Sequence, residues 1–339
     1  MSAKKMLDGK VIIVTGAGRG IGRAMAMAFA DAGGKLVVND LGASADGAGD
    51  DTSPATKVVE EIVALGGEAV ANFNSVAEWD SAHEIVQAAI DTYGRVDGLV
   101  NNAGVVHDAI FHKMTEDIFD TVLKINLKGS FNMSRACAPH FRQQEGGSIV
   151  HMTSTSGLIG NLGQANYMSA KLGIVGLSKS IALDMSRYNV RSNCISPFAW
   201  SRLFGKVPEE TPEQKARLEK IKQMTPEKIA PVAAALLSDA GKDVTGQIFA
   251  VRNNEIFLMS QSRPIRTAHT SDGWTPEAVA ERVFSAFKPS MYGLDRTADV
   301  RRGVEVFGCI RVDEFIGVGA GNQHHSIRIF KDATKTELT

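Results

Sequence analysis

Short, unbroken apolar runs recur along roughly the first 250 residues and alternate with longer stretches of helical pattern. The first run, Val11–Val14, precedes a glycine-rich turn and an Ala- and Met-rich stretch, Arg23–Ala32. Continuous apolar runs of this length are typical of strands buried on both faces of a parallel sheet. Gly33 and Gly34 then favour the left-handed conformation that ends a helix. This order predicts a βαβ unit at the start of the chain.

The same alternation continues to about residue 259. Further strands are expected at Lys35–Val38, Glu68–Phe73, Gly98–Val100, Ser148–Met152, Val190–Ile195 and Gln247–Val251. Further helices are expected at Lys57–Leu65, Ser81–Tyr93, Phe119–Cys137 and Ala165–Tyr188. Strands that alternate with helices predict an α/β fold with a doubly wound parallel sheet, Rossmann-like and of about seven strands.

Polar stretches interrupt this pattern. Residues Asp40–Pro54 are rich in Gly, Ala, Ser and Asp, which predicts an unusually long loop. Residues Ser201–Pro226 are charged and contain several prolines, which predicts a mobile helical flap. Beyond Ser260 the pattern weakens, and one amphipathic helix is expected at Thr275–Phe287. We therefore divide the chain into a Rossmann-like domain, residues 1–259, and a partly helical C-terminal extension, residues 260–339, whose polar tail we expect to be frayed.

Composition and charge narrow the class of protein. The chain has 339 residues, a net charge of −1 and 44% apolar residues, so neither nucleic acid nor an anionic membrane is an expected partner. No window approaches the roughly 18 apolar residues of a membrane helix. Three widely spaced cysteines, Cys137, Cys194 and Cys309, fit a reducing cytoplasm. No metal site is expected, because the histidines lack the i, i+4 spacing that places two ligands on one helical face.

A glycine-rich loop follows the first strand. Gly16, Gly20 and Gly22 lie in Thr15–Gly22, between a predicted strand and a predicted helix. A pyrophosphate needs backbone N–H groups and a helix N-terminus nearby, and glycine permits that close approach. The spacing differs from the G-x-G-x-x-G pattern, but the strand–turn–helix setting still predicts a dinucleotide site.

One acidic residue bears on the choice of dinucleotide. Asp40 follows the second strand, where a carboxylate accepts hydrogen bonds from the adenosine ribose and repels the extra phosphate of NADP. Arg19 acts in the other direction, since it can pair with that phosphate. We expect the acid to dominate and NAD to be preferred over NADP. The alternative is that Asp40 only caps a turn.

Tyr167 and Lys171 are four residues apart on a predicted helix and so share one face. A cation close to a phenol lowers its pKa from about 10, which makes the phenol a proton-transfer group. Ser154, at the end of the strand Ser148–Met152, is expected to hold a substrate oxygen. Its neighbours Thr153, Thr155 and Ser156 also carry hydroxyls, so any of the four is a candidate.

These motifs resemble those of the short-chain dehydrogenase/reductase family in order and spacing. Besides the glycine loop, the resemblance rests on Asn101–Gly104, on Ser154 and on Tyr167–Lys171. It implies a catalytic tetrad of Asn126, Ser154, Tyr167 and Lys171, in which the asparagine stabilises a helix kink and holds a water of a proton relay. The alternative for Asn126 is a solvent-facing helix residue. The implied cofactor contacts are Gly16, Gly18, Arg19, Gly20, Ile21, Gly22, Asp40, Ser75, Val76, Asn102, Ala103, Gly104, Tyr167, Lys171, Pro197 and Ser201.

A finer resemblance is to the (3R)-hydroxyacyl-CoA dehydrogenase domain of peroxisomal multifunctional enzymes and their bacterial relatives. It rests on Val37–Gly42, Val58–Ile62 and Gly160–Tyr167. It implies oxidation of a 3-hydroxyacyl-CoA with NAD. The resemblance to the family as a whole implies assembly as a homodimer or homotetramer through the helices Phe119–Cys137 and Ala165–Tyr188. The chain departs from the family pattern at three pairs of positions: Asn74 and Ser75, Pro197 and Phe198, and Asn253 and Asn254.

Two other functions stay open on the sequence alone. The substrate is a small molecule, and an acyl-CoA would meet the cations of the flap, but glutamates interleave with them and a solvated helix explains them equally well. A steroid or another bulky ketone would instead meet the apolar side chains of Phe198, Trp200, Leu203 and Phe204. A dinucleotide-binding regulator without catalysis is the third hypothesis.

Overall fold

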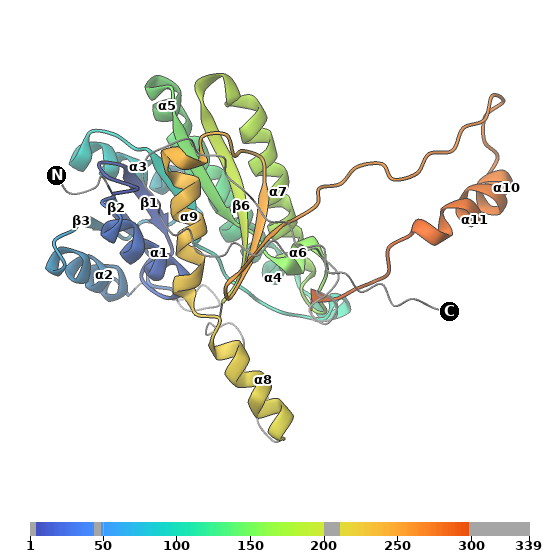
Figure 1. The fold of residues 1–339 in the computed structure, drawn as a ribbon, viewed down its shortest axis with the longest axis horizontal. Coiled ribbons are helices and arrows are strands. Elements are labelled where there is room, and N and C mark those ends of the chain that lie inside the picture. Colours follow the sequence, from blue (N-terminus) through green and yellow to red (C-terminus); the bar gives the residue numbers. More distant parts are fainter. Residues whose placement is uncertain (1–4, 44–48, 50, 200–210, 298–339) are drawn as a thin grey trace, which may run out of the picture.

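A computed structural model describes residues 5–43, 49, 51–199 and 211–297 of the chain. Its centre is one eight-stranded sheet in the order β3-β2-β1-β4-β5-β6-β7-β8 (Figure 1). All neighbouring strands are parallel except β7 and β8, which are antiparallel. The strands are β1 Val11–Thr15, β2 Lys35–Asn39, β3 Glu68–Asn72, β4 Gly98–Asn101, β5 Gly147–Met152, β6 Val190–Phe198, β7 Ile248–Arg252 and β8 Glu255–Leu258.

Helices cover both faces of this sheet. The described helices are α1 Gly20–Asp31, α2 Ser53–Ala64, α3 Trp79–Tyr93, α4 Glu116–Val122, α5 Gly129–Gln144, α6 Thr155–Leu158, α7 Ala165–Asp184, α8 Pro212–Lys222, α9 Ala230–Leu237, α10 Pro276–Ala278 and α11 Phe284–Phe287. One core cluster joins the sheet to α1, α2 and α9, and another joins the opposite face to α3 and α5. This is the predicted doubly wound α/β arrangement.

The core explains why the strands are continuous apolar runs. Within β1, Ile12 and Val14 pack in the cluster with α1 and α9, whereas Val11 and Ile13 pack in the cluster with α3 and α5. All four are at most 1% exposed. Alternation between apolar and polar residues is absent because neither face of the strand meets water.

The sheet has eight described strands rather than about seven, because β8 adds a short antiparallel edge. Asn253 and Asn254 form a two-residue hairpin between the paired Arg252 and Glu255, with Asn253 at φ 54°. Asparagine tolerates this left-handed conformation, so the Asn-Asn pair is itself a hairpin signal. The sequence pattern does not indicate β8 as a strand, because only one of its four residues is even partly buried.

The helix expected at Phe119–Cys137 is longer and interrupted. It begins at Glu116, where Thr115 caps α4 by accepting a hydrogen bond from the Ile118 N–H at 3.4 Å. A π-helical turn, Leu123–Lys128, separates α4 from α5. We refer to this segment as the π turn. The wider backbone spacing of a π turn is common at functional sites, and this one contains Asn126.

The flap and the extension are described in part. Within the flap, α8 begins at a capping box of Thr211 and Gln214, and residues 200–210 lie outside the described residues. The helix expected at Thr275–Phe287 is present as α10, a π-helical segment and α11, on an arm that leaves the sheet (Figure 1). Residues 298–339, with Cys309 and the last two histidines, lie outside the described part. None of the described helices combines the length and apolar character needed to cross a membrane.

Candidate active site

The candidate residues gather where the parallel strands end. Asp40 follows β2, Asn102 follows β4, Ser154 follows β5 by two residues, and Pro197 is the penultimate residue of β6. Because these strands are parallel, their carboxyl ends form one edge of the sheet, which is where ligands bind in open α/β folds. Ser201 lies outside the described residues.

Steric contacts account for the glycine loop. Gly16 and Gly20 have φ values of 62° and 54°, which favour glycine. A Cβ on Gly22 would lie 2.1 Å from the Gly16 carbonyl oxygen, and one on Gly18 would lie 2.7 Å from Pro54 Cβ. No side chain caps the N-terminus of α1, so no N-cap side chain occupies the first N–H groups of this helix. This geometry fits a pyrophosphate.

Asp40 holds this loop through both carboxylate oxygens. Oδ2 accepts a hydrogen bond from the Gly18 N–H at 2.7 Å, and Oδ1 accepts one from the Gly42 N–H at 2.7 Å. The second contact is the turn cap that the sequence left open as an alternative. The first places the carboxylate against the cofactor loop, so the two interpretations are compatible.

Arg19 is engaged by an acid. Its guanidinium lies 3.4 Å from the carboxylate of Asp51, in an exposed ion pair. Hydrogen bonds from Ser53 lower the pKa of Asp51, and Arg19 lowers it further. Asp51 therefore stays ionised and offsets the positive charge that would attract a ribose phosphate.

Thr15 joins the glycine loop to the end of β4, and sequence reasoning missed this role. Its Oγ1 accepts hydrogen bonds from the N–H groups of Asn102 and Ala103, at 3.0 and 3.1 Å. The Asn102 side chain donates to the carbonyls of Thr15 and Gly16, at 2.9 and 3.0 Å. A hydroxyl directly before the first glycine is the signal that could have identified it.

Ser75 and Val76 lie between β3 and α3, on the same edge of the sheet. Ser75 Oγ accepts from the Ala77 N–H at 3.2 Å, and the Val76 carbonyl accepts from the Asn132 side chain at 3.0 Å. Val76 is buried and packs against Gly129 of α5. These contacts position the segment; a role in binding adenine stays a prediction.

Ser154, Tyr167 and Lys171 come together between β5 and α7. Ser154 caps α6, accepting from the Ser156 N–H at 3.1 Å, and it hydrogen-bonds with the phenol of Tyr167. Lys171 Nζ lies 5.6 Å from the centroid of the Tyr167 ring and donates to the Met152 carbonyl at 2.8 Å. Lys171 is only 5% exposed, so its ammonium lies beneath the phenol rather than in solvent.

The geometry distinguishes Ser154 from its hydroxyl-bearing neighbours. Thr153 Oγ1 donates to the Lys171 carbonyl at 2.6 Å and is buried. Thr155 and Ser156 are also buried, whereas Ser154 is partly exposed. Of the four, Ser154 combines access to solvent with a hydrogen bond to Tyr167, so it is the hydroxyl best placed to meet a substrate oxygen.

The pKa of the phenol runs opposite to the expectation from sequence. Burial raises the pKa of Tyr167 to about 12, although the hydrogen bond with Ser154 lowers it in part. Burial also lowers the pKa of Lys171 to about 8. The charge of Asp108 raises the pKa of Tyr167 further, and the lowering expected from Lys171 is not found. Near neutral pH the phenol therefore holds its proton and is prepared to donate it.

Asn126 is fully buried, so the solvent-facing alternative is wrong. Its side chain accepts from the Val105 N–H at 2.8 Å and donates to the Val105 carbonyl at 3.0 Å. A Cβ on the adjacent Gly104 would lie 2.8 Å from Asn126 Oδ1 and 3.6 Å from Lys171 Nζ. Asn126, Gly104 and Lys171 thus meet at one point, and the tetrad implied by the resemblance is assembled.

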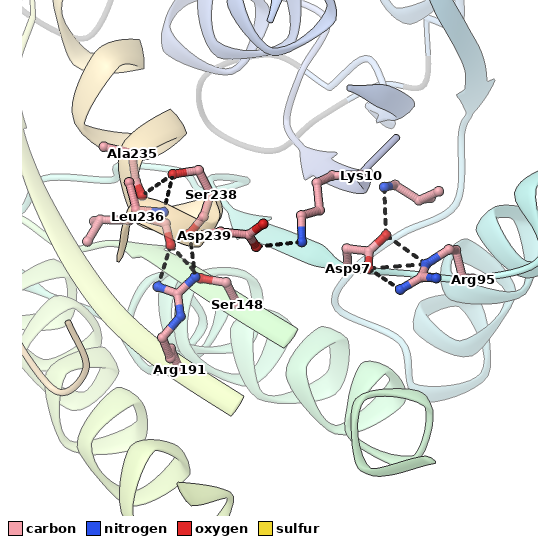
Figure 2. Close-up of polar contacts among 11 residues, drawn as sticks. Lys10, Arg95, Asp97, Ser148, Arg191, Ala235, Leu236, Ser238 and Asp239 are labelled. Carbon is pink, nitrogen blue, oxygen red and sulfur yellow. Dashed lines mark hydrogen bonds and ion pairs between the residues drawn. The ribbon is translucent and has the colours of Figure 1, made fainter. Parts of the chain in front are cut away.

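A cavity of about 530 Å³ lies at the opposite edge of the sheet, at the amino ends of the strands. Figure 2 shows the polar contacts of Lys10, Arg95, Asp97, Arg191 and Asp239, which line it. Lys10 meets Asp239 at 2.8 Å, and Arg95 meets Asp97 at 2.6 Å. Arg191 donates to carbonyls at the C-terminal end of α9, which satisfies and stabilises that helix end. These contacts explain the charges of Lys10, Arg95, Asp97, Arg191 and Asp239 as structural.

The chain is similar in sequence and in fold to known proteins. Residues 10–201 match the family model for short chain dehydrogenase. The chain is 45% identical to a Mycobacterium tuberculosis protein whose name places it among the short-chain type dehydrogenases/reductases, over 69% of this chain and 79% of that one. It is 38% identical to peroxisomal multifunctional enzyme type 2 of Mus musculus, over 83% of this chain but 37% of that enzyme.

A solved structure provides a third comparison. It is that of 7α-hydroxysteroid dehydrogenase complexed with NADH and 7-oxo glycochenodeoxycholic acid. The chain is 32% identical to it, with a TM-score of 0.66 over 75% of this chain and 97% of the other. The resemblance drawn from the motifs is confirmed: the chain belongs to the short-chain dehydrogenase/reductase family, whose enzymes use NAD(P) to act on the CH–OH groups of small molecules.

Proposed function

We propose that this enzyme uses NAD to interconvert a 3-hydroxyacyl-CoA and the matching 3-ketoacyl-CoA. The observation that carries the proposal is the contact between Ser154 and Tyr167 above the buried Lys171, at the edge of the sheet that bears the glycine loop. The name of one relative, 3-oxoacyl-[acyl-carrier-protein] reductase of Thermotoga maritima, supports a 3-ketoacyl substrate.

Each of the four side chains has one role in this proposal. Ser154 holds the substrate oxygen, and Tyr167 passes a proton to or from it. Lys171 stabilises the phenolate electrostatically, and Asn126 holds the loop at Gly104 beside it. The bound nicotinamide accepts or supplies the hydride. In the direction of ketone reduction, the raised pKa of Tyr167 matches its role as the acid.

The preference for NAD rests on two carboxylates. Asp40 binds the Gly18 N–H, close to where an adenosine ribose would lie, and Asp51 neutralises Arg19. An added ribose phosphate would meet two negative charges and an arginine that already has a partner. We therefore favour NAD over NADP.

The main alternative substrate is a steroid or another bulky ketone. The 7α-hydroxysteroid dehydrogenase structure favours it, because that enzyme is complexed with NADH and an oxidised bile acid. Of the apolar residues proposed to line such a pocket, Phe198 is buried at the end of β6, and the other three lie outside the described residues. A regulator without turnover is the third hypothesis, and the assembled tetrad speaks against it.

One set of measurements distinguishes the three hypotheses for the function. NADH oxidation is followed with acetoacetyl-CoA and with a panel of bulky ketones, and NADH binding is measured by fluorescence. Turnover of acetoacetyl-CoA at least tenfold above the bulky ketones supports the proposal. The reverse ranking favours the steroid-type function, and tight NADH binding without any turnover favours the regulator.

We further propose a homodimer or homotetramer that forms through α5 and α7. Large apolar side chains are exposed on these helices, among them Phe131, Leu172 and Leu183. Light scattering that finds only monomer would contradict this assembly. The cytoplasm stays our proposed compartment, although several relatives carry peroxisomal names.

A further inference from the structure

A line of buried polar side chains lies beneath the proposed active site and has no part in the roles given above. Asn101 ends β4, His151 lies in β5, and Ser130 and Ser134 lie on α5. None of the four is more than 4% exposed. Polar groups are costly to bury unless they are hydrogen-bonded, so a connected set of this kind needs a reason.

The line begins at the backbone of Asn126. Ser130 Oγ donates to the Asn126 carbonyl at 2.7 Å, just where the π turn passes into α5. Ser134 Oγ donates to the Ser130 carbonyl, also at 2.7 Å, one turn further on. Hydroxyls that bond back to the preceding turn are known to bend helices. Here they hold carbonyls at the point where the backbone changes from α to π spacing.

Asn101 joins the helix to the sheet. Its side-chain nitrogen donates to Ser134 Oγ at 3.0 Å and lies 3.2 Å from His151 Nδ1. An amide nitrogen has no lone pair to accept with, so His151 Nδ1 is the acceptor and the ring proton is on Nε2. Asn101 and His151 are also direct neighbours in the register of β4 and β5.

His151 is an unexpected choice for this position if stability alone matters. The ring is fully buried, and its Nε2 has no hydrogen-bond partner among the described residues. Burial and the nearby Lys171 keep the imidazole neutral by lowering its pKa to about 3. An apolar side chain would avoid the cost of the unpaired Nε2, but it would leave the Asn101 amide with only Ser134 Oγ at 3.0 Å and the Ser130 carbonyl at 3.4 Å as acceptors among the described residues.

We propose that Ser130 and His151 are positioning residues for the reaction, acting through Ser134 and Asn101 to hold the π turn. Both polar groups of the Asn126 side chain hydrogen-bond with the backbone of Val105. The position of the loop that contains Gly104 and Val105 therefore depends on the position of the π turn. The loop in turn borders Lys171 Nζ at Gly104. This inference rests on the proposed function, in which Lys171 and Tyr167 carry out proton transfer.

The test compares matched variants. Ser130→Ala removes the hydroxyl, Ser130→Thr keeps a hydroxyl that can bond back to the Asn126 carbonyl, and Ser178→Ala removes a different buried hydroxyl that pairs with Ser192 at 2.8 Å. Small misplacements of catalytic groups cost up to about 100-fold in rate. We expect Ser130→Ala to lower kcat about 10- to 100-fold while NADH affinity stays within about twofold of wild type. Ser130→Thr should restore kcat, and Ser178→Ala should leave kcat unchanged.

His151 has its own matched pair. His151→Leu removes one of the acceptors of the Asn101 amide, whereas His151→Asn offers an acceptor in its side-chain oxygen. We expect the leucine variant to lower kcat more than the asparagine variant, with little change in KM. Equal kcat for the two would remove His151 from the proposal.

A readout independent of turnover keeps the inference separate from the proposed function. Amide hydrogen exchange is measured across residues 123–130 in wild type, Ser130→Ala and Ser178→Ala. Faster exchange in Ser130→Ala alone supports positioning, and unchanged exchange overturns it. If wild type reduces no ketone, the proposed function fails while this exchange test still decides the role of Ser130. If wild type is active and Ser130→Ala has the kcat of Ser178→Ala, the positioning role is refuted.

Discussion

Replacing Tyr167 with phenylalanine removes the proton that the proposed chemistry needs and little else. The ring keeps its size and its place beside Lys171, 5.6 Å from Nζ. What disappears is one phenol hydroxyl, which hydrogen-bonds with Ser154. Because the pKa of Tyr167 is about 12, this hydroxyl is protonated near neutral pH, as the proposed role of an acid in ketone reduction requires.

The expected loss can be bounded. A positioned general acid contributes about 10²- to 10⁴-fold in rate, which corresponds to about 3–5 kcal/mol of activation free energy. One lost hydrogen bond changes the free energy of unfolding by only about 0.5–1.5 kcal/mol. The variant is therefore expected to fold and to bind NADH almost as wild type does, while kcat for reduction falls at least 100-fold.

The assay follows NADH oxidation with acetoacetyl-CoA under saturating cofactor, with NADH affinity measured by fluorescence. Tyr93→Phe is the matched control: its hydroxyl donates to the Leu36 carbonyl at 3.5 Å, at the amino-terminal edge of the sheet. We expect wild-type kcat from the control. Activity of Tyr167→Phe within tenfold of wild type would refute the assignment of the acid.

Three further predictions test the cofactor loop and the buried core. Asp40→Ala should relax the preference for NAD, and an unchanged ratio of kcat/KM for NAD over NADP would contradict the ribose role. Gly22→Ala should abolish NADH binding, because its Cβ would lie 2.1 Å from the Gly16 carbonyl; wild-type affinity by fluorescence would show that the loop is not the cofactor site. Between pH 6.5 and 3 the unfolded chain binds a proton that folded His151 does not, so wild type should lose up to about 1.4 kcal/mol of stability per pH unit as pH falls. His151→Asn should flatten that slope in urea titrations, and an identical slope would contradict the neutral buried imidazole.

Most of the fold can be predicted from short-range sequence patterns. The run Val11–Val14 favours a strand buried on both faces, since no polar residue interrupts it and a buried helix usually needs a longer apolar pattern. The glycines at positions 16, 20 and 22 define the loop, because a side chain there would collide with backbone or require an unfavourable φ. Such requirements act over a few residues, so they can be read from the order of residue types.

Only part of the candidate site could be predicted from the sequence. Tyr167 and Lys171 could be paired from sequence because one helical turn fixes their relation. The choice of Ser154 over Thr153 could not, since it depends on which hydroxyl the Lys171 carbonyl binds. The direction of the pKa of Tyr167 was also beyond reach, because it is set by the burial of the phenol in the folded chain.

The sequence by itself therefore determined the βαβ order, the cofactor loop and the reactive pair on α7, all of which follow from short-range geometry. Only the tertiary structure decided the π turn, the clamp of Asn126 on Val105 and the buried contact between Asn101 and His151, which lie 21 and 50 residues apart. Hydrogen bonds across such separations depend on how sheet and helices pack, and packing balances the hydration that each polar group loses against the partner it gains.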